Sequence, residues 1–157
     1  MNKLFSKYNL KNIAIILLIA IFFVSDRLLK VLSISGRKSF SLIGDILTFS
    51  FTPNYFIAFS LPVGGKILEV TILILIVLMI VFSLYLLFKK YSVPLIIGLA
   101  AIILGAVSNY IDRLRLGYVI DYLYLKYFTV FNLADALIAF GTILILIYIY
   151  LDKKTDH

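Results

Sequence analysis

Four apolar segments, each long enough to cross a bilayer, dominate this chain of 157 residues. A membrane-spanning helix needs about 20 consecutive, mostly apolar residues. Hydrophobic residues make up 63% of the chain, and a water-soluble fold of this size could not bury that much apolar surface. The sequence therefore predicts an all-α integral membrane protein, with a single domain over residues 1–157 and four transmembrane helices at about residues 13–32, 67–88, 93–111 and 133–151.

The connections between these segments indicate the topology. Four spans place both termini on the same side as the short turn at residues 89–92, and both outer loops, 34–66 and 112–131, on the other side. Lysines on the terminal side, such as Lys89 and Lys90, flank the spans closely. Because cytoplasmic loops carry an excess of Lys and Arg, we expect cytoplasmic termini and extracytoplasmic outer loops.

The first outer loop contains the pattern of a β-strand. Residues 48–52 alternate between polar and apolar side chains, and Gly44-Asp45 before them is a turn signal. Residues 39–43 are a possible partner strand. We therefore expect a small extracytoplasmic β-hairpin or sheet element lying on the membrane.

The residue inventory narrows the chemistry. The chain has no cysteine, and its single histidine is the last residue, His157. Thiolate chemistry and Ser-His or Cys-His catalysis are therefore excluded, and serine, lysine and carboxylate chemistry remain. We predict no metal and no cofactor. The net charge of +7 comes from short basic groups that flank apolar segments, without interleaved aromatic residues. We expect membrane lipids as a partner and no nucleic acid.

Asp121 and Asp135 are the best-placed acidic residues. Asp121 lies in an apolar and aromatic stretch, where the charged form of a carboxyl is disfavoured. Asp135 falls in the first turn of the fourth span, where it is either a capping-box partner of Asn132, a catalytic group, or both. If the two carboxyls meet, they share a proton, and one can activate water while the other protonates the carbonyl or the leaving amine. That chemistry is the hydrolysis of a peptide bond.

Other polar residues fall near the same membrane boundary. Asp26 and Lys30 are four residues apart and share a helix face, which indicates either an interfacial ion pair with a snorkelling lysine or a functional pair. Asn109, Asp112 and Arg113 end the third span, as a hydrogen-bonded frame or as ordinary helix-end and headgroup contacts.

Small residues on the third span form a smooth face at steps of three, four and three. Such a face allows two helices to pack closely in a membrane. We therefore interpret it as structural; its members are Gly98, Ala101, Gly105 and Ser108.

Five blocks of the chain, in order, resemble those of the lipoprotein signal peptidase family, also called signal peptidase II. They are DRLLK (26–30), NYFIAFS (54–60), NYIDR (109–113), GYVIDY (117–122) and FNLAD (131–135). Each block alone is a weak signal, but five in register with four spans are highly specific.

The resemblance implies an aspartic endopeptidase of the bacterial cytoplasmic membrane. Such enzymes remove the signal peptide from diacylglyceryl-modified prolipoproteins, cutting before the lipidated cysteine at the outer membrane face. By position, Asp121 and Asp135 match the catalytic pair. The positions that match supporting or substrate-binding residues are Asp26, Lys30, Asn54, Ala58, Asn109, Asp112, Arg113, Asn132 and Ala134.

Three positions depart from the family pattern. Phe56 stands where glycine is usual, and we expect it to alter substrate or inhibitor recognition. Ser108 also replaces a glycine, a change that helix packing should tolerate. Arg27 replaces the usual glutamine, and we expect it to face lipid headgroups. None of these changes removes the proposed catalytic groups.

Two other functions are weighed against the peptidase. A metal-dependent lipid-headgroup transferase would also place aspartates at a membrane surface, but Asp112, Asp121 and Asp135 lack the close spacing of that class. A non-enzymatic transport or assembly subunit would carry polar residues in the middle of its spans, whereas the later spans here have apolar centres.

Overall fold

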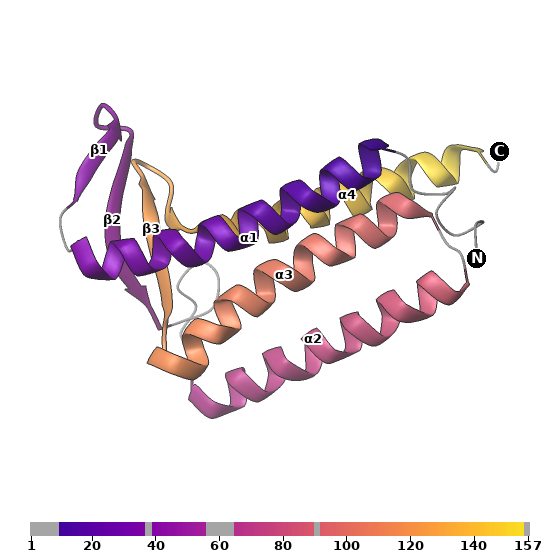
Figure 1. The fold of residues 1–157 in the computed structure, drawn as a ribbon, viewed down its shortest axis with the longest axis horizontal. Helices are drawn as coiled ribbons and strands as arrows, with labels where there is room; N and C mark the ends of the chain where they lie inside the picture. Colours follow the sequence, from indigo (N-terminus) through magenta and orange to yellow (C-terminus); the bar gives the residue numbers. More distant parts are fainter. Residues whose placement is uncertain (1–9, 37–38, 56–64, 90–91, 156–157) are drawn as a thin grey trace.

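A computed structural model describes residues 10–36, 39–55, 65–89 and 92–155 (Figure 1). Its described part is mostly helical, with one antiparallel sheet. In chain order the elements are α1 (Leu10–Gly36), β1 (Phe40–Ile43), β2 (Leu47–Asn54), α2 (Gly65–Phe88), α3 (Val93–Leu116), β3 (Val119–Leu125), β4 (Val130–Phe131) and α4 (Leu133–Thr155).

Within the described ranges, three helices are long and apolar enough to cross a membrane. They are α2, α3 and the part of α4 from Leu133 to Asp152. Only 11% of the apolar stretch of α2 is buried inside the protein, so most of the apolar side chains of this helix face outward. Such a surface is stable in lipid and not in water. Helix α1 is 27 residues long but carries Asp26, Arg27 and Lys30 in its second half.

Helices α3 and α4 pack through glycines, as the stripe of small residues predicts. A side-chain carbon at Gly105 would collide with the carbonyl oxygen of Ala134, and one at Gly141 would collide with that of Gly98. Ala101 on the same face is fully buried. The close contact of the two backbones fixes the start of α4, and with it Asp135, against α3.

The sheet lies at one end of the helices, while α1 begins and α4 ends at the other (Figure 1). Its strand order is β1-β2-β3-β4, with antiparallel pairs throughout. The predicted hairpin is confirmed as β1 and β2. Strands β3 and β4 are not among the predictions, which treat residues 112–131 as a loop.

The expectation for residues 112–131 needs correction. Helix α3 continues to Leu116 and ends at Gly117, whose φ of 78° is left-handed and suits glycine. Asp112 and Arg113 are therefore helical residues. Strand β3 follows at once, and its register places Asp121 opposite Thr52 of β2. Much of the segment 112–131 is consequently paired strand, and pairing with β2 gives the side chain of Asp121 a defined direction.

Candidate active site

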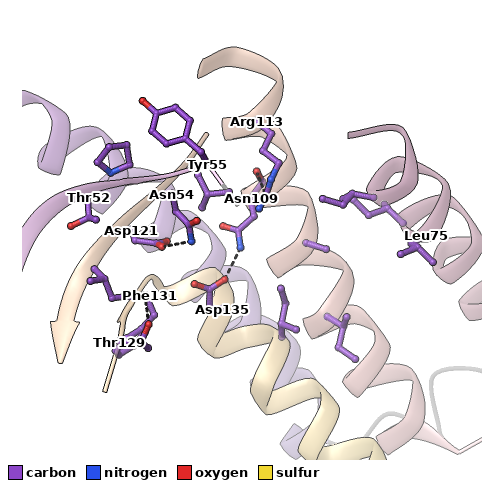
Figure 2. A pocket seen from close by; sticks show the side chains of 18 of the residues that line it. Thr52, Asn54, Tyr55, Leu75, Asn109, Arg113, Asp121, Thr129, Phe131 and Asp135 are labelled. Carbon is purple, nitrogen blue, oxygen red and sulfur yellow. Dashed lines mark hydrogen bonds between the residues drawn. The ribbon is translucent and has the colours of Figure 1, made fainter. Parts of the chain in front are cut away.

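Asp121 and Asp135 line one cavity at the junction of the sheet and the helices. Its volume is about 650 Å³, and α2, α3, α4 and the strands enclose it. Figure 2 shows Asp121 on β3 and Asp135 at the start of α4, with Leu75 of α2 on the opposite side. The structure thus brings together the two carboxyls that the sequence singles out, from elements that are separate in the chain.

Asp121 is held by two amide donors. Asn54 Nδ2 donates to its Oδ2 at 2.9 Å, and Asn132 Nδ2 donates to its Oδ1 at 2.7 Å. Burial raises the pKa of Asp121 to about 6, and the negative charge of Asp135 contributes to the same rise. The two amide hydrogen bonds oppose the rise because they favour the ionised form. The carboxyl is therefore able to gain or lose a proton near neutral pH.

Asp135 is both a capping residue and a cavity residue. Its Oδ2 accepts the backbone N–H of Asn132 at 3.2 Å, and its own N–H donates to Asn132 Oδ1 at 2.9 Å. These reciprocal bonds are the capping box that the sequence predicts. The other oxygen, Oδ1, accepts Asn109 Nδ2 at 2.7 Å. Capping therefore leaves Asp135 facing the cavity.

Asn132 connects the two aspartates. Its side chain contacts Asp121, its backbone contacts Asp135, and the residue is fully buried. Asn132 Nδ2 also lies 3.2 Å from Asn109 Oδ1, which accepts Lys30 Nζ at 2.8 Å. The pair is thus part of one hydrogen-bonded network that reaches α1.

Asp26 and Lys30 form a buried ion pair, so the alternative of a snorkelling lysine at the membrane interface is wrong. Lys30 is 0% exposed, and its Nζ lies 3.1 Å from Asp26 Oδ2 and 2.8 Å from Asp112 Oδ2. Charges buried to this degree are stable only when they are paired and hydrogen-bonded. The two carboxylates and the ammonium therefore act together as a support beneath the cavity.

Arg27 and Ser108 also join this support, a role that the sequence did not predict for either residue. Arg27 turns inward instead of facing headgroups, and its Nη1 lies 2.6 Å from Asp112 Oδ1. Ser108 is more than a small packing residue, because its hydroxyl donates to Asp26 Oδ2 at 2.6 Å. We define these residues as the buried charge cluster: Asp26, Arg27, Lys30, Ser108 and Asp112.

Tyr122 is a site residue that the sequence reasoning missed. Its hydroxyl donates to Asp26 Oδ1 at 2.9 Å and accepts the backbone N–H of Leu133 at 3.1 Å. Burial raises the pKa of Tyr122, and the charge of Asp26 adds to the rise, so the phenol stays protonated. The sequence feature that could have indicated Tyr122 is its place in the alternating, aromatic-rich segment that forms β3.

Three candidate residues remain to be placed: Ala134, Arg113 and Ala58. The backbone N–H of Ala134 donates to Asp26 Oδ1 at 3.1 Å, so Ala134 belongs to the support. Arg113 lines the cavity in the field of both aspartates. The expected frame of Asn109, Asp112 and Arg113 is rearranged, since the Asp112 carboxylate contacts Arg27 and Lys30. Ala58, like Phe56, lies outside the described residues.

Over the described ranges, no three acidic or imidazole side chains are placed to hold a metal ion. The cavity offers two carboxyls surrounded by amide donors and apolar walls, and burial raises the pKa of one of them, Asp121, to about 6. Two carboxyls that share one cavity are the arrangement by which aspartic proteases are recognised, and in a helical membrane protein it points to the class of membrane-embedded aspartic proteases.

Comparison with known proteins specifies the family. The family model for signal peptidase (SPase) II matches residues 18–151. The lipoprotein signal peptidase of Enterococcus faecalis is 36% identical over 133 residues, covering 82% of this chain and 81% of that protein. That of Clostridium tetani is 32% identical over 153 residues, covering 88% and 97%. The chain belongs to the signal peptidase II family, the aspartic proteases of lipoprotein processing.

The fold is that of solved bacterial membrane enzymes. One such structure has a TM-score of 0.79 at 24% identity and covers 96% of this chain and 94% of its own. A second has a TM-score of 0.71 at 24% identity and covers 91% and 95%. These likenesses show that the arrangement of helices and sheet is shared.

Proposed function

We propose that Asp121 and Asp135 are the catalytic pair of an endopeptidase that removes the signal peptide from diacylglyceryl-modified prolipoproteins. The cut falls just before the lipidated cysteine, at the outer face of the bacterial cytoplasmic membrane. One observation carries the assignment: buried Asn132 contacts both carboxyls, and both line the same cavity. Membership of the signal peptidase II family supports the substrate class.

In this proposal the pair holds one proton and one water. The ionised carboxylate takes a proton from the water as it attacks the scissile carbonyl, while the protonated carboxyl gives its proton to the carbonyl oxygen. Collapse of the tetrahedral intermediate breaks the C–N bond. The leaving amine takes up a proton from one carboxyl of the pair, and a hydroxyl of the intermediate returns its proton to the other carboxylate, which restores the shared proton. General acid and base catalysis of this kind contributes about 10²–10⁴ in rate. The pKa of Asp121, raised to about 6, supports a shared proton near neutral pH.

The shape of the cavity supports an apolar, lipid-bearing substrate. Its helical walls are apolar, and its polar groups gather at the end near the sheet. A signal helix and acyl chains could occupy the apolar part while the cleavage site reaches the aspartates. The apolar residues of these walls are Ile72, Leu75, Ile76, Met79, Ile102, Ala106 and Ile138.

We assign four spans to a single membrane-embedded peptidase domain over residues 1–157, with α1 as the first span. Residues 13–24 of α1 are uninterrupted apolar residues, and Ile19 packs in the same core cluster as Ile97 and Leu137. The proposed topology has cytoplasmic termini and an extracytoplasmic site. It is supported by Lys89, which follows α2 at the end of the helices remote from the sheet (Figure 1).

The assignment is tested with purified enzyme in detergent and a lipidated prolipoprotein. Asp121→Asn and Asp135→Asn should each lose at least about 10²-fold in rate, because neither variant can complete the proton transfers. Asp45→Asn, at the exposed tip of the sheet, is the matched control and should cleave at the wild-type rate. Wild-type processing by either site variant would contradict the assignment.

The same assay tests the substrate class and the rival function. Substrate without the diacylglyceryl group should be cleaved far more slowly, because the apolar walls then lose part of their contact. A metal-dependent lipid-headgroup transferase would instead stop on addition of a chelator. Full activity with a chelator and a preference for the lipidated substrate would exclude that alternative.

A further inference from the structure

We propose that Arg27 is a positioning residue for Asp121, acting through the carboxylate of Asp112 and the backbone of Ile120. The inference rests on the proposed role of Asp121. Arg27 is absent from the candidate site residues, and its inward direction is a finding of the structure.

The first step is the contact between Arg27 and Asp112. Arg27 Nη1 lies 2.6 Å from Asp112 Oδ1 and also 3.1 Å from the carbonyl oxygen of Ser108. The guanidinium is therefore tied to α3 at two points. Because Asp112 Oδ1 is held by Arg27, the other oxygen of that carboxylate has a fixed direction.

The second step is what that other oxygen does. Asp112 Oδ2 accepts Lys30 Nζ at 2.8 Å and the backbone N–H of Ile120 at 3.3 Å. Strand β4 pairs with β3 only at Leu123 and Tyr124. At Ile120 the edge of β3 therefore relies on side chains in place of a neighbouring strand.

The third step joins Ile120 to the catalytic carboxyl. The carbonyl oxygen of Ile120 accepts Asn132 Nδ2 at 3.3 Å, and the same nitrogen donates to Asp121 Oδ1 at 2.7 Å. Ile120 is thus held at its N–H by Asp112 and at its C=O by Asn132, directly before Asp121 in the chain. A shift of Asp112 would move the backbone from which Asp121 projects.

The balance of charge gives a second reason why Arg27 positions Asp121. The buried charge cluster holds two carboxylates, Asp26 and Asp112, and two cations, Lys30 and Arg27. Without Arg27, one ammonium would have to serve both carboxylates. Asp112 would then be drawn toward Lys30, and its bond to Ile120 would weaken.

The test compares Arg27→Met, Arg27→Gln and Arg27→Lys with Arg115→Met as the matched control, since Arg115 is exposed at the end of the same helix as Asp112. Each folded, monodisperse variant is assayed on lipidated prolipoprotein. We expect Arg27→Met to lower kcat about 10- to 100-fold with KM changed less than about twofold, because misplaced catalytic groups cost turnover and not binding. Arg27→Lys, which keeps the charge, should recover most of kcat. Arg27→Gln restores the residue usual in the family but not the charge, and it should not recover kcat, because one ammonium then serves both carboxylates.

Each outcome of this experiment either supports or contradicts the proposed role of Arg27. If Arg27→Met does not fold, a kcat of Arg27→Lys well above that of Arg27→Gln supports the role. Wild-type kcat in folded Arg27→Gln would overturn it, as would equal losses in the Lys and Gln variants. A raised KM with unchanged kcat would make Arg27 a substrate contact instead. Failure of the wild-type enzyme to process prolipoprotein would overturn the proposed function, which separates the two inferences.

Discussion

At the scale of single residues, the side-chain amide of Asn132 has two roles, one for its oxygen and one for its nitrogen. Its Oδ1 accepts the N–H of Asp135 and caps α4, while its Nδ2 donates to Asp121. The N-terminus of helix α4 and the orientation of the proposed catalytic carboxyl of Asp121 thus depend on the same side chain. The two roles can be separated by substitution, because an N-cap needs only an oxygen.

Asn132→Ser should keep the cap and lose the donor to Asp121, whereas Asn132→Ala should lose both. We expect both variants to lose about 10²-fold in kcat, since Asp121 is no longer oriented. Asn132→Ala should also lose about 1 kcal/mol of stability relative to the serine variant. Activity assays and thermal unfolding in detergent measure the two effects. A serine variant with wild-type turnover would show that Asn132 is a cap alone.

Asn54 tunes the protonation of Asp121. Its hydrogen bond lowers the pKa of that carboxyl against the rise caused by burial. Asn54→Ala should therefore raise the pKa of Asp121 above about 6, and the shared proton should persist to higher pH. The alkaline limb of the pH profile of kcat/KM should move to higher pH. Ser41→Ala, on β1 away from the cavity, is the control, and an unmoved limb in Asn54→Ala would contradict the prediction.

At the scale of elements, the position of Asp135 depends on how closely α3 and α4 approach. Gly105 contacts the backbone of Ala134, the residue directly before Asp135. Strand β3 likewise fixes Asp121 by its register with β2. The site is thus set by one helix contact and one strand pair, each from elements that the chain does not place in succession.

Gly105→Ala should push α4 away from α3 just below the site. The added methyl would collide with Ala134 O and with Cγ1 of Ile138. Overpacking of this kind costs about 1–3 kcal/mol, and we expect activity to fall with it. Gly36→Ala is the matched control, because a Cβ there meets no atom within 4 Å. Thermal unfolding and turnover of the two variants should differ; equal values would argue against tight packing at Gly105.

At the scale of the whole molecule, the buried charge cluster joins α1 to α3 and to the sheet. The carboxylate of Asp26 accepts hydrogen bonds from three other elements: from Ser108 on α3, Tyr122 on β3 and Ala134 on α4. In a membrane protein the apolar surfaces between helices give little specificity, because lipid is equally apolar. Polar contacts of this kind therefore specify which helices meet and in which register.

Lys30→Met should leave two buried carboxylates with one remaining cation, at a cost of about 3–5 kcal/mol. The double variant Lys30→Met with Asp26→Asn restores neutrality and should recover part of that loss. Lys126→Met is the control, since Lys126 pairs with exposed Asp45 at 3.9 Å and should cost less than about 1 kcal/mol. Folded yield and thermal unfolding in detergent measure the series. A Lys30→Met variant as stable as the Lys126 control would contradict this role.

Features that depend on residues close in sequence were predicted correctly. Three of the four apolar segments, the β1–β2 hairpin, the capping box of Asn132 with Asp135, and the glycine face of α3 all have signals within a few residues. The absence of cysteine and of an internal histidine left serine, lysine and carboxyl chemistry as the options. These inferences are reliable because helix periodicity, strand alternation and capping are local effects.

Partner choice over long sequence distances was decided by tertiary structure alone. Lys30 could have snorkelled and Arg27 could have faced headgroups, yet both turn inward to α3, some 80 residues away. Strand β3 pairs with β2, from which two helices separate it in the chain. A charge at a membrane boundary has several partners of similar energy, and only the packing of helices and sheet decides which of them it meets.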